Sequence, residues 1–443
     1  MYDLVIEGRA LIAGELVDSY LCIESGRISR ICRSDPGKGS MGELHRMGRK
    51  IILPGVVDSH VHMRDPGFEH KEDLTTGSIS AAFGGVASFI DMPNNRPPTF
   101  NVRALRQKEE AASRKCVVDF GFNLGLMSSS DPSDIEAALR GSKGAPPPSA
   151  LKAFMGETTG SLVFGPFEEL RRWSGFIARN GMVLCIHAED GNLFGSREEG
   201  RPGRVARDHA DSRPAEAESS AVRRSLTAME GFEEHLHVLH ISSELGLKEV
   251  EKSKATVEVT PHHLLLDIKW AERNLENQAL AKVNPPVRTP SERAALWRGI
   301  EEGKVHTIGS DHAPHTSEEK SQGLSSPSGI PGVETMLPLL LAQVNTRRVG
   351  LQTMVRLLSE NPSSRFGLTG RGRIQEGFFA DLIAVDLKDE REVDEERLHS
   401  KCGWSPYNGF KAVFPSRVYS RGDLVVEDES LCCSPGRGRN LRG

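Results

Sequence analysis

The sequence predicts an α/β fold, a (β/α)8 TIM-type barrel with a small composite β-sandwich domain built from both termini. Three observations lead to this prediction. Eight short, apolar, β-branched runs alternate with helical patterns through the middle of the chain. Both ends instead show partial apolar alternation that turn residues interrupt. The length of 443 residues suits a large barrel with a small accessory domain.

The barrel strands are expected where the apolar runs lie, and helices are expected between them. In chain order the eight runs are residues 56–63, 86–92, 117–124, 150–155, 182–188, 236–242, 256–261 and 305–310. Helical patterns cover residues 71–83, 102–113, 167–180, 215–230 and 291–302. A doubly wound parallel sheet has the same alternation, so the rhythm alone leaves that architecture open.

The two ends of the chain each hold too few strands for a stable domain. Strand-like segments occupy residues 4–12 and 21–31, and then 379–385, 412–418 and 424–426. We therefore expect residues 1–52 and 371–430 to pair into the composite β-sandwich. Residues 53–370 are expected to form the metal-binding barrel. The Gly/Arg-rich residues 431–443 are expected to be a disordered tail.

Composition excludes several classes of function. A net charge of -5 gives no basic surface for nucleic acid and no polybasic membrane anchor. No apolar run approaches the ~18 residues that span a bilayer, and the first residues do not resemble a signal peptide. Seven cysteines without a CxxC pair are typical of reduced thiols. The sequence thus predicts a cytoplasmic protein without a nucleic-acid or membrane partner.

The ends of the predicted strands carry the chemistry. Active sites of such barrels lie at the C-terminal ends of the strands. Almost every run here ends in a side chain that suits a metal or an anion: His60 and His62, Asn94, Asn123, Lys152, His187, His240, His262 and His263, and Asp311 with His315. Purely structural turns would place Ser, Gly or Asp there. This convergence predicts an active site at that rim.

His60 and His62 form a His-x-His pair on a strand. Side chains repeat every two residues, so both imidazoles face the same side and suit Zn²⁺ or a similar ion. With 15 histidines in the chain, one such pair is not specific by itself. The second pair, His235 and His237, lies earlier in its strand, and we interpret it as structural.

Four further residues complete the predicted metal site. His187 and His240 end two successive apolar strands at equivalent places. Lys152 lies inside an apolar strand, where burial lowers the pKa of its amine and favours addition of CO₂. The resulting carbamate has two oxygens that can bridge two metals. Asp311 is expected to ligate one metal and to accept a proton from bound water.

A group of polar residues near these ligands could recognise a carboxylate. Arg64 offers a planar guanidinium that forms two parallel hydrogen bonds with a carboxylate. Asn94 lies at a neighbouring strand end, and Asn284 lies in the loop before the last unit. His315 follows Asp311 and is expected to be a further donor to substrate.

Several of these segments together resemble dihydroorotases. The resemblance is carried, in order, by Asp-Ser-His-Val-His-Met-Arg-Asp-Pro-Gly at residues 58–67, Asp-Met-Pro-Asn at 91–94, Val-Thr-Pro-His-His at 259–263, Val-Asn-Pro-Pro-Val-Arg at 283–288, Gly-Ser-Asp-His-Ala-Pro-His at 309–315 and Gly-Ile-Pro-Gly-Val-Glu at 329–334. The likeness runs from about residue 1 to 427. The segment around Lys152 resembles the carbamylated-lysine subgroup, which includes allantoinases and hydantoinases.

The resemblance implies an amidohydrolase barrel with two Zn²⁺ per chain. It implies that His60, His62 and Asp311 bind one metal, that His187 and His240 bind the other, and that carbamylated Lys152 bridges them. Arg64, Asn94 and His315 would hold the substrate carboxylate, with Asn284 nearby. The implied activity is the reversible cyclisation of N-carbamoyl-L-aspartate to L-dihydroorotate in pyrimidine biosynthesis.

Two alternatives remain open from the sequence. An allantoinase or hydantoinase would share the metal ligands but would not need Arg64. A non-catalytic partner of aspartate carbamoyltransferase would be an interaction protein, and such proteins usually lose ligands. Aspartate carbamoyltransferase is therefore kept as a possible protein partner, beside the small-molecule substrate.

Overall fold

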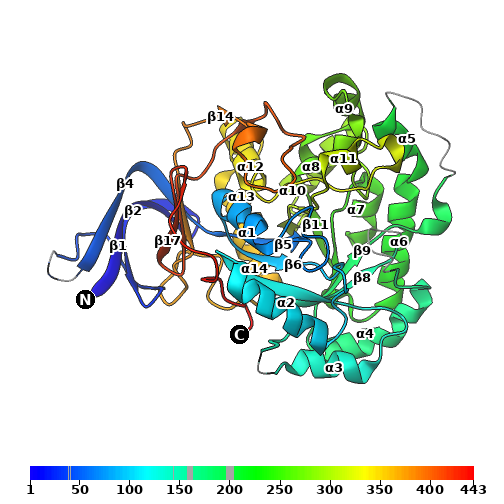
Figure 1. The fold of residues 1–443 in the computed structure, drawn as a ribbon, viewed down its shortest axis with the longest axis horizontal. Helices are drawn as coiled ribbons and strands as arrows, with labels where there is room; N and C mark the ends of the chain where they lie inside the picture. The colour runs from blue at the N-terminus through cyan, green and yellow to red at the C-terminus, as the bar shows by residue number, and fades with distance from the viewer. Residues whose placement is uncertain (38, 40, 143, 157–162, 196–203) are drawn as a thin grey trace.

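The computed structural model contains two eight-stranded sheets, which Figure 1 shows side by side. It describes residues 1–443 except 38, 40, 143, 157–162 and 196–203. One sheet is parallel and runs through β5 (Val56–Val61), β6 (Val86–Asp91), β7 (Asp119–Gly125), β8 (Ala150–Phe154), β9 (Leu184–His187), β10 (Leu236–Val238), β11 (Thr256–Val259) and β12 (Thr307–Ile308). These are the eight runs expected from the sequence, so the parallel barrel is confirmed.

The first and last strands meet and nearly close the barrel. Val61 at the end of β5 forms a parallel bridge with His312, which follows β12. The backbone N–H of His62 donates to the carbonyl of His312 at 2.7 Å. This closure brings residues about 250 positions apart to one rim, and it excludes the open doubly wound sheet.

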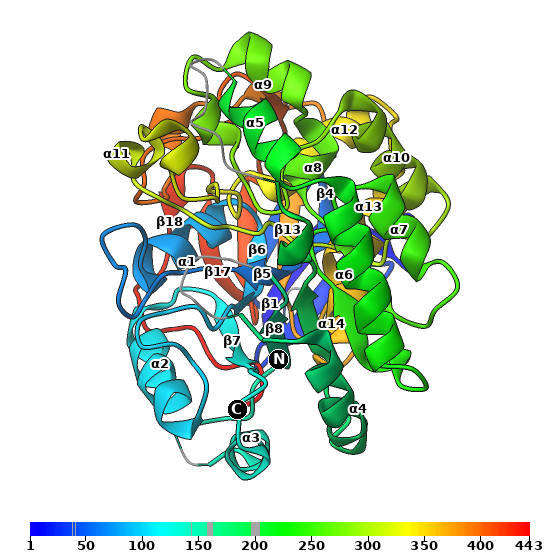
Figure 2. The same ribbon diagram turned by 90° about the vertical axis from the view of Figure 1, so that its right-hand side faces the viewer.

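Helices surround the parallel sheet, as Figure 2 shows for α2, α4, α6 and α7. The α-helices are α1 (Leu74–Phe83), α2 (Val102–Lys115), α3 (Pro132–Arg140), α4 (Leu170–Arg179), α5 (Val205–Ser212), α6 (Ala215–Ala228), α7 (Glu244–Val250), α8 (Pro261–Leu265), α9 (Ile268–Asn274), α10 (Pro290–Glu301), α11 (Ser317–Lys320), α12 (Met336–Asn345), α13 (Leu351–Val355) and α14 (Asn361–Arg365). In α4 the buried Leu170, Trp173 and Ile177 recur at helical spacing and face the core. The five helices expected from the sequence correspond to α1, α2, α4, α6 and α10.

The other sheet joins the two termini. Its order is β18 (Ser430–Leu431), β17 (Asp423–Glu427), β16 (Arg417–Ser420), β13 (Leu382–Val385), β4 (Met41–Pro54), β1 (Tyr2–Ile12), β2 (Glu15–Glu24) and β3 (Arg27–Cys32). The link is the antiparallel pair of β4 and β13, in which Leu53 lies opposite Ile383. A composite sheet from both ends is thus confirmed, as one hydrogen-bonded sheet. The short strands β14 (Arg391–Glu392) and β15 (Lys411–Ala412) pair separately.

Two details of this sheet differ from the sequence expectation. The segment 21–31 is two strands, because a turn at Ser25 and Gly26, both with positive φ, separates β2 from β3. The long strand β4 was not expected, since its charged residues hide the apolar alternation. The division of the chain at residues 52 and 371 remains a proposal.

The expectation of a disordered tail at residues 431–443 is wrong. Asn440 bridges Phe120 in β7, and the backbone N–H of Leu441 donates to the carbonyl of Phe120 at 2.8 Å. The Arg442 guanidinium donates to the carbonyl of Phe366 at 2.6 Å. Composition alone suggested disorder, but these arginines and glycines find backbone partners at the N-terminal end of the barrel.

No helix within the described ranges combines the length and apolar character that crossing a bilayer requires.

Candidate active site

A cavity opens at the C-terminal ends of the barrel strands and gathers nearly all the predicted site residues. Its walls are His60, His62, Arg64, Asn94, Lys152, Phe154, His187, His240, Asn284, Asp311, Ala313, Ser328 and Gly329. These residues come from β5, β8, β9 and the segments that follow several barrel strands. Parallel strands all end at one rim, so side chains far apart in sequence meet there.

His60 and His62 face the same carboxylate. The Nε2 atom of each lies 3.2 Å from Oδ1 of Asp311. Burial alone would raise the pKa of Asp311, but the neighbouring His60 and the hydrogen bond from His62 hold it well below its usual value. Burial lowers the pKa of His62 to about 4, so its imidazole is neutral at pH 7. A charged carboxylate and a neutral imidazole are both suitable metal ligands.

The opposite ring nitrogens of this pair are anchored behind the site. The Nδ1 atom of His60 lies 2.7 Å from Oε1 of Glu258, and Nδ1 of His62 lies 2.6 Å from Oδ1 of Asn94. These contacts at Nδ1 orient both rings so that their Nε2 atoms point toward the cavity and Asp311. Glu258 was missed in the sequence analysis. Glu258 is a charged residue within the apolar strand β11, and this feature could have identified it, as the same feature identified Lys152.

His187 and His240 form the second pair. Nδ1 of His187 lies 3.0 Å from Nε2 of His240, so both nitrogens converge on one point. On its far side His187 donates from Nε2 to Glu189 at 2.9 Å, and Glu189 also accepts from Arg213 at 2.6 Å. Burial lowers the pKa of both imidazoles, which keeps them neutral. Glu189 and Arg213 were not identified from the sequence.

Lys152 lines the same cavity with its amine buried over the ring of Phe154. The side chain is 1% exposed, and its Nζ has no hydrogen-bond partner among the residues that the structure describes. Burial lowers the pKa of this amine to about 8. A buried amine without a partner is costly for the fold, unless a ligand or a modification completes its contacts.

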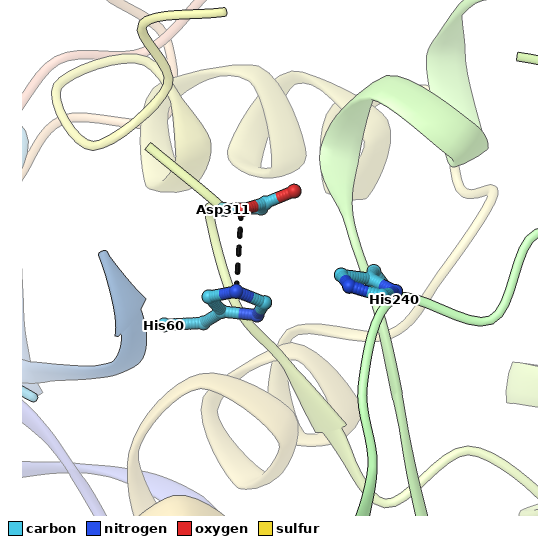
Figure 3. Close-up of side chains that lie close together, drawn as sticks. All are labelled: His60, His240 and Asp311. Carbon is cyan, nitrogen blue, oxygen red and sulfur yellow. Dashed lines mark ion pairs between the residues drawn. The ribbon is translucent and has the colours of Figure 1, made fainter. Parts of the chain in front are cut away.

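The donor set fits a divalent metal. Figure 3 shows His60, His240 and Asp311 facing one another, with His60 and Asp311 in an ion pair. One ligand atom from each of the three lies within 4.8 Å of the others. Imidazole nitrogens with a carboxylate are typical of zinc and related ions. The unpartnered Lys152 amine beside this group agrees with a further charged species in the cavity.

Three of the four predicted carboxylate-binding residues line the cavity. Arg64, Asn94 and Asn284 line it, and Asn284 accepts a hydrogen bond from His209 at 2.9 Å. His315 is fully buried behind Arg64, and its Nε2 lies 3.1 Å from the guanidinium. Burial and the adjacent Arg64 hold the pKa of His315 well below its usual value. The structure therefore places His315 beside Arg64 rather than on the cavity wall.

The backbone is strained at three of the residues that line the cavity. Arg64, His240 and Asp311 have φ angles of 62°, 39° and 46°, in the left-handed region that disfavours side chains. Such conformations cost about 1–3 kcal/mol each and cluster at functional sites. The surrounding packing holds these backbone conformations in place, and they in turn set the directions of the three side chains.

The second His-x-His pair lies elsewhere, as expected. Nδ1 of His235 hydrogen-bonds the carbonyl of Met182 at 2.8 Å. Nδ1 of His237 lies 2.7 Å from the hydroxyl of Thr256. Neither residue lines the cavity in the described part of the chain.

Comparison with known proteins identifies the class. The sequence pattern of the amidohydrolase family matches residues 51–425, so the chain belongs to that family. The chain is 36% identical to a dihydroorotase of Methanosarcina acetivorans, with 100% of this chain and 96% of the relative covered. It is also 36% identical to a dihydroorotase of Archaeoglobus fulgidus, with 96% and 97% covered. The structure is similar to the L-hydantoinase (dihydropyrimidinase) of Arthrobacter aurescens, with a TM-score of 0.91, 27% identity and 99% of each chain covered.

Proposed function

We propose that this protein is a metal-dependent dihydroorotase, which interconverts N-carbamoyl-L-aspartate and L-dihydroorotate in pyrimidine biosynthesis. The observation that carries the proposal is Arg64 in the same cavity as His60, His62, His187 and His240. A cation beside a metal-type site suits a cyclic amide that bears a carboxylate. Full-length similarity to dihydroorotases supports the same substrate. The protein is thus a hydrolase of cyclic amides that acts on a small molecule.

The proposed cofactor is a pair of Zn²⁺ ions. His60, His62 and Asp311 would hold one ion, and His187 with His240 would hold the other. Carbamylated Lys152 would bridge them, which would give its buried amine the contacts that it otherwise lacks. When bound, the metals would supply an activated water and polarise the carbonyl of the ring amide.

The protein side chains would orient the substrate and move the proton. Arg64 would bind the substrate carboxylate through its planar guanidinium, with Asn94 and Asn284 beside the ring. His315 would support this part of the site from behind Arg64. Asp311 would carry a proton to the leaving ring nitrogen, since its low pKa makes it a carboxylate before the reaction. In synthesis these steps run in reverse.

A hydantoinase-type or allantoinase-type activity is the second candidate. Likeness to a solved L-hydantoinase favours it, because those enzymes share this barrel and side sheet. Their class of substrate would leave Arg64 without a carboxylate to bind. A non-catalytic partner of aspartate carbamoyltransferase is less well supported, since all six predicted metal-site residues are present. Binding of that enzyme stays a prediction.

One assay separates these candidates. Purified, zinc-loaded protein is given dihydroorotate, allantoin and dihydrouracil under matched conditions. We expect kcat/KM for dihydroorotate to exceed the other two values by at least ~100-fold, because only this ring carries the carboxylate. A preference for allantoin or dihydrouracil would replace the dihydroorotase proposal with the second candidate. No turnover of any ring by metal-loaded protein would favour the non-catalytic alternative.

A further inference from the structure

A line of polar side chains leads from Arg64 away from the cavity. His315 lies behind Arg64, and beyond His315 lie Lys71 and Glu319. Nδ1 of His315 is 3.2 Å from Nζ of Lys71 and 3.4 Å from Oε2 of Glu319. Lys71 and Glu319 form an ion pair at 2.7 Å. The mechanism proposed above uses neither of these two residues.

Arg64 depends on two acceptors for its orientation. Its Nε–H donates to the carbonyl of Pro314 at 3.2 Å, and its Nη2 lies 3.1 Å from Nε2 of His315. The other N–H groups of Arg64 have no partner among the described residues, and the side chain lines the cavity. These two contacts therefore hold the guanidinium so that its remaining donors can meet a carboxylate.

His315 can accept from only one of the two cations that flank it. Nε2 faces Arg64 and also the carbonyl of Ser328 at 3.2 Å, while Nδ1 faces Lys71 and Glu319. A neutral imidazole has one N–H and one lone pair. If Nδ1 carries the proton it donates to Glu319, and Nε2 accepts from Arg64. If Nε2 carries the proton it donates to Ser328, and the lone pair goes to Lys71 instead.

Glu319 decides between these two tautomers. Its carboxylate accepts from Lys71 and offers an acceptor to Nδ1–H, so it favours the state in which Nε2 is free for Arg64. We propose that Glu319 is a positioning residue that fixes the Nδ1–H tautomer of His315 and thereby holds Arg64 for the substrate carboxylate. The inference rests on the proposed function for the identity of that substrate.

Glu319 also has a structural role, and the test must separate the two. With Thr316 it forms the capping box of α11: Oε2 accepts from the backbone N–H of Thr316 at 3.1 Å. Glutamine serves in a capping box as well as glutamate does. Glu319→Gln therefore keeps the helix cap while it removes the charge that pairs with Lys71. Glu318→Gln, an exposed neighbour in the same helix, is the matched control.

The kinetic test compares a ligand that has the carboxylate with one that lacks it. We expect Glu319→Gln to raise KM for dihydroorotate about tenfold with little change in kcat, and to leave the inhibition constant of dihydrouracil within about twofold. In the double variant Glu319→Gln/Lys71→Met the competing cation is gone, so KM should return to within about threefold of wild type. Glu318→Gln should match wild type. Equal losses for both ligands, or a double variant worse than Glu319→Gln, would overturn the proposal.

A spectroscopic test does not depend on the substrate. In ¹⁵N-histidine-labelled protein, the His315 ring signals are assigned by their loss in His315→Gln. We expect Nδ1 to be protonated in wild type and Nε2 to be protonated in Glu319→Gln. The same tautomer in both proteins would contradict the inference. If wild type does not turn over dihydroorotate but the tautomer changes, the proposed substrate fails while the role of Glu319 stands.

Discussion

One buried charged group at each end of the barrel shows a contrast in how the fold surrounds it. At the C-terminal mouth, the Lys152 amine is buried without a hydrogen-bond partner among the described residues. At the N-terminal end, Asp119 is equally buried but accepts from Arg371 at 2.5 Å, from Arg421 at 3.0 Å and from the backbone N–H of Arg439 at 2.9 Å. The Lys152 amine therefore lacks a hydrogen-bond acceptor, whereas the Asp119 carboxylate has three donors.

This difference follows from what each end must do. An unsatisfied buried polar group costs about 1–3 kcal/mol of stability, and a charged group costs more, so the Lys152 amine is a candidate for a functional role. At the mouth, the proposed metal site would use the Lys152 amine, and the backbone of Arg64, His240 and Asp311 is strained there. At the other end, ion pairs and backbone hydrogen bonds hold Asp119 and the C-terminal tail.

Replacing His187 at the mouth is expected to give the largest effect. His187→Ala removes one of two imidazoles that converge on the same point and are proposed as metal ligands, so bound metal should fall below two ions per chain. Turnover of dihydroorotate should drop at least ~1000-fold, because the activated water is lost. Elemental analysis and steady-state kinetics measure both, with circular dichroism to check the fold.

The control for this prediction is His45→Ala in the side sheet, where His45 hydrogen-bonds Tyr419 and does not line the cavity. It should keep its metal and its activity. A His187→Ala protein that retains two metals and full turnover would remove His187 from the site.

Lys152→Ala is expected to reduce activity nearly as much as His187→Ala, for a different chemical reason. Without the amine no carbamate can form, so the metals would lose their bridge and activity should fall by ~1000-fold. Short carboxylic acids such as acetate should restore part of the activity, since they supply two oxygens in the vacated space. An experimental structure with a free Lys152 ammonium beside two bound metals would contradict the bridging role.

Arg64→Ala should have an intermediate effect that depends on substrate. We expect kcat/KM for dihydroorotate to fall about 100-fold, since a bidentate contact to the carboxylate and its orienting effect are both lost. Binding of dihydrouracil should change little. Arg64→Lys should restore only part of the loss, because an ammonium keeps the charge but not the planar geometry. Unchanged dihydroorotate kinetics in Arg64→Ala would remove the main argument for this substrate.

The active-site end of the barrel was easier to predict from the sequence, because its residues stand out from their immediate neighbours in the chain. His60 and His62 stand two residues apart at the end of an apolar strand, and Lys152 is a charge inside another. Each of these residues interrupts an otherwise apolar run. Because the C-terminal ends of barrel strands meet at one rim, the three side chains are then expected to lie together. Glu258 carried the same local signal, so it was available to sequence reasoning and was overlooked.

The residues that support the site were not predictable in this way. Glu189 and Arg213 lie 24 positions apart, and neither interrupts an apolar pattern at a strand end. Their pairing depends on the path of the chain between β9 and α6. That segment contains helix α5, and its residues 196–203 lie outside the described part.

The tail was mispredicted because composition describes a segment without its surroundings. Residues 431–443 contain glycines and arginines and few apolar side chains, which is typical of disorder. Some of their partners, such as the carbonyl of Val117 and the carboxylate of Asp119, lie more than 300 positions away in sequence. The sequence of residues 431–443 by itself does not indicate partners that are distant in the chain.

The smallest expected effect comes from replacing Leu441, which tests how the tail packs at the N-terminal end of the barrel. This side chain is partly buried against an apolar cluster that includes Val57, Ile90 and Phe366. Leu441→Ala should lower the free energy of unfolding by about 1–2 kcal/mol, less than for a fully buried leucine, because part of its surface is already exposed. Urea denaturation followed by fluorescence measures the change. Leu245→Ala, at a leucine 39% exposed on the barrel surface, is the control and should shift the midpoint much less.

Because Leu441 lies at the end opposite the cavity, kcat and KM for dihydroorotate should equal those of wild type. A Leu441→Ala protein with unchanged stability would mean that the tail does not close the barrel, and one with reduced kcat would mean that the two ends are not independent.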